Sequence, residues 1–272
     1  MATQTERAAK FRALHARAGA FVIPNPWDAG SARLLASLGY EALATTSAGY
    51  AFSLGRLDGT ITLEEKLAHC ASLSAATDLP VSADLENCFA DDPKKAAETI
   101  TRAAAAGVVG GSIEDYSGTA IYDFGHSVER VKAAVEAARA LAFPFTLSAR
   151  AENLIRGRPD LDDTIRRLQA YEAAGADVLY APGLKTLEEV RAVTGALKKP
   201  VNVVITGLQG ATVANLAEAG VKRISIGGAL ARAAIGELLR SGREMREQGT
   251  FNWVAQAAPG AEIGKLLGAW SK

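Results

Sequence analysis

The sequence has only two cysteines, Cys70 and Cys88, in 272 residues, and it has no long run of apolar residues. Two thiols are too few for a disulfide framework or a four-thiolate zinc site, which favours a reducing compartment. No stretch approaches the ~18 apolar residues of a membrane span. The polar N-terminal segment lacks the apolar centre of a secretory signal peptide. We therefore expect a cytoplasmic protein that has no membrane partner.

A surplus of charge of either sign is also missing. Lys and Arg together number 30, and Asp and Glu together number 30. Nucleic-acid-binding domains usually carry a basic surplus, so the balance argues against a nucleic-acid partner. Hydrophobic residues make up 49% of the chain, which is enough for a large core.

Short apolar, β-branched runs alternate with helical stretches along the whole chain. We expect strands at 20–24, 41–46, 81–85, 109–114, 145–149, 177–180, 201–205 and 222–226. These runs recur about every 29 residues, which is the size of one strand–helix unit. Eight such units in a row predict a (β/α)8 TIM barrel. A doubly wound sheet is the alternative, but the first turn, PNPWDAGSAR, lacks the Gly-x-Gly-x-x-Gly motif of that fold.

Two segments lie outside these eight units. Residues 3–18 predict an extra helix before the barrel, and residues 251–272 form an amphipathic C-terminal helical tail. We interpret residues 1–272 as one barrel domain. The tail has more apolar surface than a monomer normally leaves in water. We therefore expect it to be an oligomerisation segment, with the last barrel helix, about 228–248, swapped between partners.

Acidic residues follow two neighbouring strands. Asp84 and Glu86 share one side if the third strand continues through them, and Glu114 ends the fourth strand. Active sites of these barrels lie at the carboxyl ends of the strands. Acids that meet there repel one another unless a cation or a proton neutralises them. Oxygen ligands suit Mg²⁺ or Mn²⁺. The alternative is that each acid caps the following helix.

Three further positions are candidates for binding a substrate. Arg150 has the inward phase of the fifth strand and could clamp a carboxylate with two N–H groups; an ion pair with Glu152 or Glu114 is the alternative. Ser47 lies in a small-residue segment that a ligand oxygen could approach, although a plain turn fits as well. Asn202 has an inward strand phase, and a buried, satisfied amide is its alternative interpretation.

Six runs of the sequence resemble the isocitrate lyase/phosphoenolpyruvate mutase superfamily. In order they are PNPWDAGSAR, TTSAGYAFSLGRLDG, VSADLEN, SIED, SARAEN and RRLQAYEAAGADVLYAPG, and the resemblance covers about residues 8–230. It implies a (β/α)8 barrel that binds Mg²⁺ and a 2-oxo acid or its enolate. Members break or form C–C or P–C bonds next to that acid. They commonly form dimers of helix-swapped dimers, so the resemblance implies a homotetramer.

The resemblance also implies roles for individual residues. Asp84 matches the direct metal ligand, and Glu86 and Glu114 match acids that hold the metal, through water. Arg150 matches a second carboxylate-binding group, and Asp58 is similar to a mouth aspartate of the mutase branch. The implied carboxylate cradle comprises Ser47, Ala48, Gly49 and Tyr50, with Asn202 as a further substrate contact. The implied catalytic residues are Ser47, Glu114 and Arg150.

The segment 115–126 departs from the family because it has neither the catalytic cysteine nor the lysine of the corresponding loops. We expect a Mg²⁺-dependent carbon–carbon lyase similar to methylisocitrate lyase but without the loop cysteine. Its substrate would be a 2-oxo or 2-hydroxy di- or tricarboxylate. One alternative is a phosphonopyruvate or carboxyphosphonoenolpyruvate mutase or hydrolase. The other is a non-catalytic 2-oxo acid binding protein.

Overall fold

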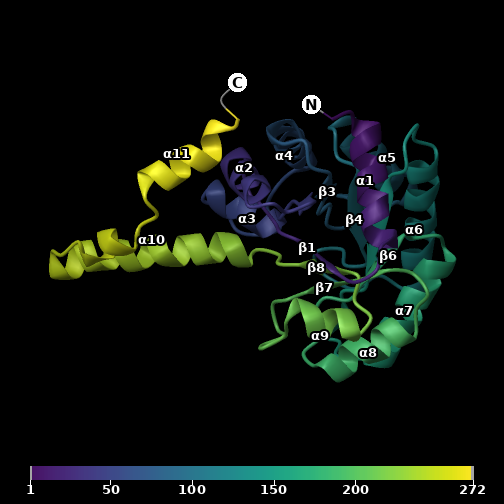
Figure 1. The fold of residues 1–272 in the computed structure, drawn as a ribbon. Coiled ribbons are helices and arrows are strands. Elements are labelled where there is room, and N and C mark those ends of the chain that lie inside the picture. Colours follow the sequence, from purple (N-terminus) through teal and green to yellow (C-terminus); the bar gives the residue numbers. More distant parts are fainter. Residues whose placement is uncertain (1, 271–272) are drawn as a thin grey trace.

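The computed structural model describes residues 2–270 and confirms all eight expected strands (Figure 1). The strands are β1 (Phe21–Ile23), β2 (Leu43–Ala44), β3 (Val81–Ala83), β4 (Gly110–Glu114), β5 (Thr146–Arg150), β6 (Val178–Tyr180), β7 (Val201–Val204) and β8 (Arg223–Ser225). Each strand overlaps its predicted range, and β5 ends one residue later than expected, at Arg150. The third strand stops at Ala83, so the predicted alternation through residue 86 is wrong.

The eight strands form one parallel sheet in the order β1-β8-β7-β6-β5-β4-β3-β2. The sheet nearly closes between β1 and β2, where the amide of Ala44 donates to the carbonyl of Pro24 at 3.0 Å. Asn25 spans this seam: its Nδ2 donates to the Thr45 carbonyl, and its Oδ1 accepts from the amides of Ile226 and Gly227. The (β/α)8 barrel is therefore confirmed over the doubly wound alternative.

Helices follow the strands, and all but the last of them cover the outside of the barrel. They are α2 (Ala29–Ser37), α3 (Ser47–Ser53), α4 (Leu63–Ala76), α5 (Pro93–Ala105), α6 (Phe124–Arg139), α7 (Leu161–Ala173), α8 (Leu187–Gly195), α9 (Val213–Glu218) and α10 (Ala229–Gln248), with a 3-10 turn, η1 (Asn153–Ile155), after β5. Capping residues determine where several of these helices begin. Thr62 and Glu65 form a capping box at α4, for example, and Asp92 caps α5 ahead of Pro93.

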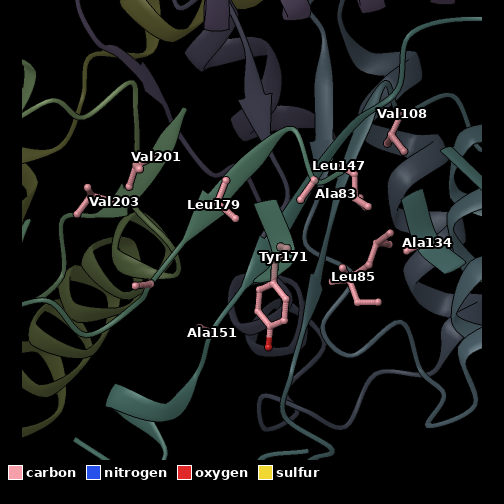
Figure 2. Packing of buried hydrophobic residues seen from close by; sticks show 14 of the residues in the cluster. Ala83, Leu85, Val108, Ala134, Leu147, Ala151, Tyr171, Leu179, Val201 and Val203 are labelled. Atoms are coloured by element: carbon pink, nitrogen blue, oxygen red, sulfur yellow. The ribbon is translucent and has the colours of Figure 1, made fainter. Parts of the chain in front are cut away.

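The main core lies between the sheet and these helices, while the inside of the barrel is polar. Figure 2 shows Leu147, Leu179 and Val203 of three successive strands in the apolar cluster, together with Tyr171 of α7. On β5, Leu147 alternates with the inward-facing Ser148, which is also buried. This alternation places hydroxyl, amide and charged groups inside the barrel, where they can serve a ligand.

The expected N-terminal helix is α1 (Gln4–Ala16). Its residues Ala8, Phe11 and Leu14 form a second buried cluster with Phe21 of β1 and Val109 at the start of β4. Because these contacts involve the beginnings of strands, α1 covers the amino-terminal end of the barrel. The opposite end is left for the candidate site.

The C-terminal part leaves the barrel. Figure 1 shows α10 extending outward and α11 (Gly260–Gly268) turning back toward α2, with a 3-10 turn, η2 (Asn252–Gln256), between them. Ser37 of α2 donates to the Leu266 carbonyl and accepts from the indole of Trp270. Leu238 and Phe251 nevertheless remain 69% and 63% exposed. The expected oligomer interface stays a prediction, and the tail's last two positions lie outside the described residues.

Within residues 2–270, no helix has the length and apolar character that a membrane span requires.

Candidate active site

Two adjoining cavities, of about 480 and 410 Å³, lie at the carboxyl ends of the strands. Ser47, Asp58, Asp84 and Arg150 line both of them. Most of the predicted site residues are brought together here. Ala48 and Asn202 line only the first cavity, and Glu86 and Glu114 only the second.

The guanidinium of Arg150 lies among three carboxylates. Its Nη1 donates to Asp84 Oδ1 at 2.9 Å, and its Nη2 pairs with Glu114 Oε2 at 3.2 Å. Its Nε and Nη2 also contact Glu152 Oε1, at 3.0 and 2.7 Å. The ion pairs with Glu152 and Glu114 that the sequence offered as an alternative are therefore present. Three buried or nearly buried acids therefore pair with Arg150, and Glu152 also pairs with Arg156 at 3.3 Å.

The acids of this cluster are incompletely neutralised. Burial and the neighbouring Asp84 raise the pKa of Glu86 to about 7. Burial also raises the pKa of Glu114 well above its ordinary value, despite Arg150. Burial opposes ionisation of Asp84 too, but Arg150 and Lys66 hold the pKa of that carboxyl below its usual value. The site therefore has room for additional positive charge.

The donor set fits a hard divalent cation. Glu86 Oε1 is buried and has no hydrogen-bond partner among residues 2–270, and oxygen is the ligand that Mg²⁺ prefers. Over the same residues, no three acidic, His or Cys side chains are grouped as a ready-made metal site. A cation here would therefore be held by few protein oxygens, with water and substrate oxygens completing its coordination, as is usual for Mg²⁺.

The loop that carries Glu86 has an unusual backbone. Glu86, Cys88 and Phe89 have φ angles of 51°, 57° and 56°, and no other non-glycine residue in the described chain has a positive φ. Such conformations persist where the surrounding structure enforces them, often at functional sites. Cys88 itself is fully buried, and burial raises the pKa of its thiol to about 12. It is a packing residue rather than a mouth nucleophile.

The expected cradle after β2 is the start of helix α3. Thr46 caps this helix by accepting from the Gly49 amide at 3.2 Å. The Ser47 amide donates to Asp84 Oδ2, also at 3.2 Å. Thus Ser47 and Ala48 lie on the cavity wall and Ser47 contacts the expected metal ligand directly.

Gly49 and Tyr50 lie apart from both cavities. A Cβ at Gly49 would lie 2.6 Å from Thr46 Cγ2 and 3.1 Å from side chains of Trp27 and Ala231, so glycine is needed there for packing. The Tyr50 ring stacks on His69 with ring centroids 3.9 Å apart. Gly49 and Tyr50, which were predicted to contact the substrate, therefore pack against other residues and line neither cavity.

The segment after β4 is a shorter loop than expected. Helix α6 begins at Phe124, so the loop spans 115–123 and His126 is helical. A bridge between Tyr116 and Ile121 folds the loop on itself. Tyr116, Ser117 and Gly118 line the second cavity. The loop that lacks the family's cysteine and lysine thus still borders the acidic cluster.

Arg223 on β8 is a cavity residue that the sequence analysis missed. Its Nε donates to Asn202 Oδ1 at 2.8 Å, and its Nη2 donates to Ser148 Oγ at 3.0 Å. Asn202 in turn donates to Ser225 Oγ at 3.0 Å. The sequence did contain a signal for this residue. Arg223 is a charged residue two positions before Ser225 on a short strand, so both side chains point to the inside of the barrel.

An eight-stranded parallel barrel with acids, an arginine and hydroxyl groups around the carboxyl ends of its strands has the architecture of a barrel enzyme. Comparisons with known proteins identify the family. The family model for phosphoenolpyruvate phosphomutase matches residues 11–246. The chain belongs to this family, within the isocitrate lyase/phosphoenolpyruvate mutase superfamily of lyases, mutases and hydrolases that act on 2-oxo acids.

Individual relatives agree with this assignment. An uncharacterized protein of Mycobacterium tuberculosis is 32% identical over 219 residues, 80% of this chain and 81% of the relative. The 2-methylisocitrate lyase of Escherichia coli is 31% identical over 208 residues, 72% of this chain and 69% of the relative. A solved structure from Burkholderia cenocepacia J2315, provisionally described as a lyase/mutase, is 60% identical, covers 97% of both chains and has a TM-score of 0.95.

Proposed function

We propose that this chain is a Mg²⁺-dependent lyase that cleaves a carbon–carbon bond of a 2-oxo or 2-hydroxy carboxylate. The observation that carries the proposal is the group of acids around Arg150, beside the unpartnered carboxylate of Glu86. The similarity to 2-methylisocitrate lyase supports the same class of reaction.

Asp84 would hold the cation directly, and Glu86 and Glu114 would hold it through water. When bound, Mg²⁺, or Mn²⁺ in its place, supplies Lewis-acid stabilisation of negative charge on the substrate. Asp58, Asp84, Glu86 and Glu114 all line the second cavity, and carboxylate oxygens suit either ion.

The remaining residues would bind and orient the substrate. The Ser47 hydroxyl and the Ala48 backbone border the cavity next to Asp84, where they can hold the carboxylate of a 2-oxo acid. Arg150 places a fixed positive charge where an enolate oxyanion develops. Glu114, whose pKa burial raises well above its ordinary value, is suited to holding or moving a proton. Asp58 lies on the wall of both cavities.

A turnover screen tests this function. Oxaloacetate, methylisocitrate, dimethylmalate and phosphonopyruvate are each incubated with the protein, with Mg²⁺ and with a chelator. We expect a 2-oxo acid product from at least one of the first three substrates, only when Mg²⁺ is present. Oxo-acid binding without any product would contradict the proposal and support a binding protein instead.

The match to the phosphomutase model favours a second candidate, a mutase or hydrolase acting on phosphorus–carbon substrates. Turnover of phosphonopyruvate alone in the same screen would support this candidate and contradict the lyase. The loop 115–123 borders the acids in either case and would contribute to the choice between reactions.

We also propose that the chain forms a homo-oligomer, a dimer of dimers, through α10 and the tail. Leu238, Leu239, Phe251 and Val254 are between 48% and 69% exposed in the single chain, and apolar surface of this kind marks an interface. Light scattering at micromolar concentration should report a tetramer. A monodisperse monomer would contradict the proposal, and a Leu238→Glu/Leu239→Glu variant should dissociate the tetramer.

A further inference from the structure

Arg223 and Arg130 are both buried and have no acidic partner within residues 2–270, but Arg130 donates to three backbone carbonyls and lines neither cavity. Arg223 is 6% exposed, and no acidic residue within 2–270 forms an ion pair with it. Its Nε and Nη2 contact a neutral amide and a neutral hydroxyl, and its Nη1 is buried without any hydrogen-bond partner in the described chain. By contrast, the buried Arg167 pairs with Asp115 at 3.1 Å and Asp163 at 2.9 Å.

A buried guanidinium without an anion is costly, because burial removes its hydration and neutral hydrogen-bond partners replace it only in part. Burial accordingly lowers the pKa of Arg223 to about 10, so the group still carries its charge at neutral pH. Burial and the positive charge of Arg223 together lower the pKa of His15 on α1 to about 3. Arg223 is the first residue of β8 and pairs in register with Phe21, which packs against α1, so it lies deep in the barrel, toward the end that α1 covers.

Arg223 also lines the cavity of about 480 Å³ that Ser47 and Asp84 line. Asn202 holds its Nε and is itself anchored on Ser225, so the guanidinium is fixed in orientation. Arg150, the other arginine deep in this cavity, already pairs with three acids. Arg232 also lines this cavity but is exposed, so Arg223 is the buried cationic group of the cavity that lacks an acidic partner among residues 2–270.

We propose that Arg223 is a subsite for a second, distal carboxylate of the substrate. This inference rests on the proposed function, in which the first carboxylate is held beside Ser47 and Arg150. The substrate would then be a 2-oxo or 2-hydroxy dicarboxylate whose distal group reaches the inside of the barrel. Asn202 is a positioning residue for Arg223, and its amide hydrogen bond sets the orientation of the guanidinium.

Calorimetric titration with matched ligand pairs tests the subsite. Oxaloacetate is compared with 2-oxobutanoate, and 2-oxoglutarate with 2-oxopentanoate, all with Mg²⁺; each pair differs by the distal carboxylate. The wild-type protein should bind one dicarboxylate about 10- to 100-fold more tightly than its monocarboxylate partner, the range for a charge-assisted hydrogen bond. Arg223→Met should abolish that preference and leave monocarboxylate affinity unchanged.

Two further variants sharpen the result. Arg223→Lys keeps the charge without the fixed fork and should keep only part of the preference, so it also tests the subsite if Arg223→Met does not fold. Arg102→Met removes a positive charge from an exposed ion pair with Glu64 on the outside of the barrel and should behave as wild type.

Several outcomes would overturn the subsite. A dicarboxylate preference that survives in Arg223→Met would contradict it, as would equal binding of both members of each pair by wild type; the proposed lyase would still stand in both cases. Stabilisation by chloride or phosphate that needs Arg223, without any dicarboxylate preference, would identify an inorganic anion site instead. Absence of all 2-oxo acid binding by wild type would contradict the proposed function as well.

Discussion

Two sides of the barrel, the acidic side at its mouth around β3 to β5 and the deeper side around β7 and β8, have opposite electrostatic problems. Around β3 to β5, the guanidinium of Arg150 pairs with Asp84, Glu114 and Glu152, and Arg156 adds a second pairing to Glu152. Around β7 and β8, the hydrogen bonds of Arg223 within residues 2–270 go to the neutral side chains of Asn202 and Ser148. A bound cation would therefore stabilise the acidic side, and a bound anion would stabilise the β7–β8 side. One Mg²⁺ bound together with a dicarboxylate would satisfy both sides.

The two sides also differ in backbone geometry. The acidic side includes three positive φ angles at non-glycine residues within positions 86–89, whereas β8 and its neighbours have regular strand pairing. Residues held in sparsely populated conformations carry a cost that the rest of the fold must offset. The contrast places the strained segment at the proposed metal side, where Glu86 must be directed into the cavity.

Among the changes considered, replacement of Asp84 should have the largest effect, a loss of metal affinity on the acidic side. Asp84→Asn removes the proposed direct ligand, so Mg²⁺ affinity should fall by more than the roughly 10- to 100-fold that loss of an outer partner costs. The fold should persist because Asp84 follows the end of β3 and belongs to neither apolar cluster. Calorimetry with Mn²⁺ and circular dichroism measure the two quantities.

Glu64→Gln is the matched control for Asp84→Asn, because Glu64 is an exposed acid that contacts Arg102 on the outer surface. Its metal affinity should equal that of wild type. Wild-type metal affinity in Asp84→Asn would show that the acidic side does not hold the cation.

Replacement of Arg150 should have the next largest effect. Arg150→Lys keeps the positive charge but loses the planar fork that joins Asp84, Glu114 and Glu152. Affinity for 2-oxo acids should fall about 10- to 100-fold, as expected when a charge-assisted hydrogen bond is lost. Titration with pyruvate measures this, and unchanged affinity would mean that Arg150 serves only the protein's own acids.

Lowering the pH from 8 to 6 should reduce Mg²⁺ affinity by a smaller factor, about tenfold. The pKa of Glu86 is raised to about 7, so Mg²⁺ must displace a proton from it below that pH. Mg²⁺ affinity should therefore be about tenfold lower at pH 6 than at pH 8. Glu86→Gln should remove most of this dependence, whereas an equally steep profile in that variant would assign it to another group.

The same raised pKa has the opposite consequence for stability without metal. The folded chain binds the Glu86 proton more tightly than the unfolded chain does. Glu86 therefore stabilises the fold at low pH, and this contribution is lost as pH rises toward 7. The unfolding midpoint of wild type should fall relative to that of Glu86→Gln between pH 5 and pH 8, and a parallel course of the two would contradict the shift.

The smallest effect is expected when an ion pair on the outer surface of the barrel is removed. The ion pair between Arg102 and Glu64 has side chains that are 45% and 75% exposed. Arg102→Met should change the free energy of unfolding by about 1 kcal/mol or less and leave ligand affinity unchanged. Chemical denaturation checks the first value, and a large loss would show that charge on the outer surface matters as much as charge in the mouth.

The sequence was sufficient to predict the fold because the strand–helix period and the caps are local signals. All eight strands and α1 were found. The gathering of Ser47, Asp84, Glu114 and Arg150 followed from the rule that the carboxyl ends of parallel strands meet.

The parts of the site that were missed depend on contacts across the barrel. Nothing local distinguishes Gly49, which packs against Trp27 and Ala231, from a ligand-binding glycine. Likewise, the stacking of Tyr50 on His69 joins two helices. Arg223 was missed because its importance comes from the acid that it lacks, and this is visible only once the inside of the barrel is assembled.

The most direct test of this account is a calorimetric titration of the wild-type protein with oxalate, a planar, unreactive mimic of a 2-oxo acid enolate. The titration is done once with saturating Mg²⁺ and once after removal of metal by a chelator. The account predicts that oxalate binds at least about tenfold more tightly with Mg²⁺, because the cation offsets the carboxylates around Arg150. Equal affinity in both conditions, or no binding in either, would contradict it.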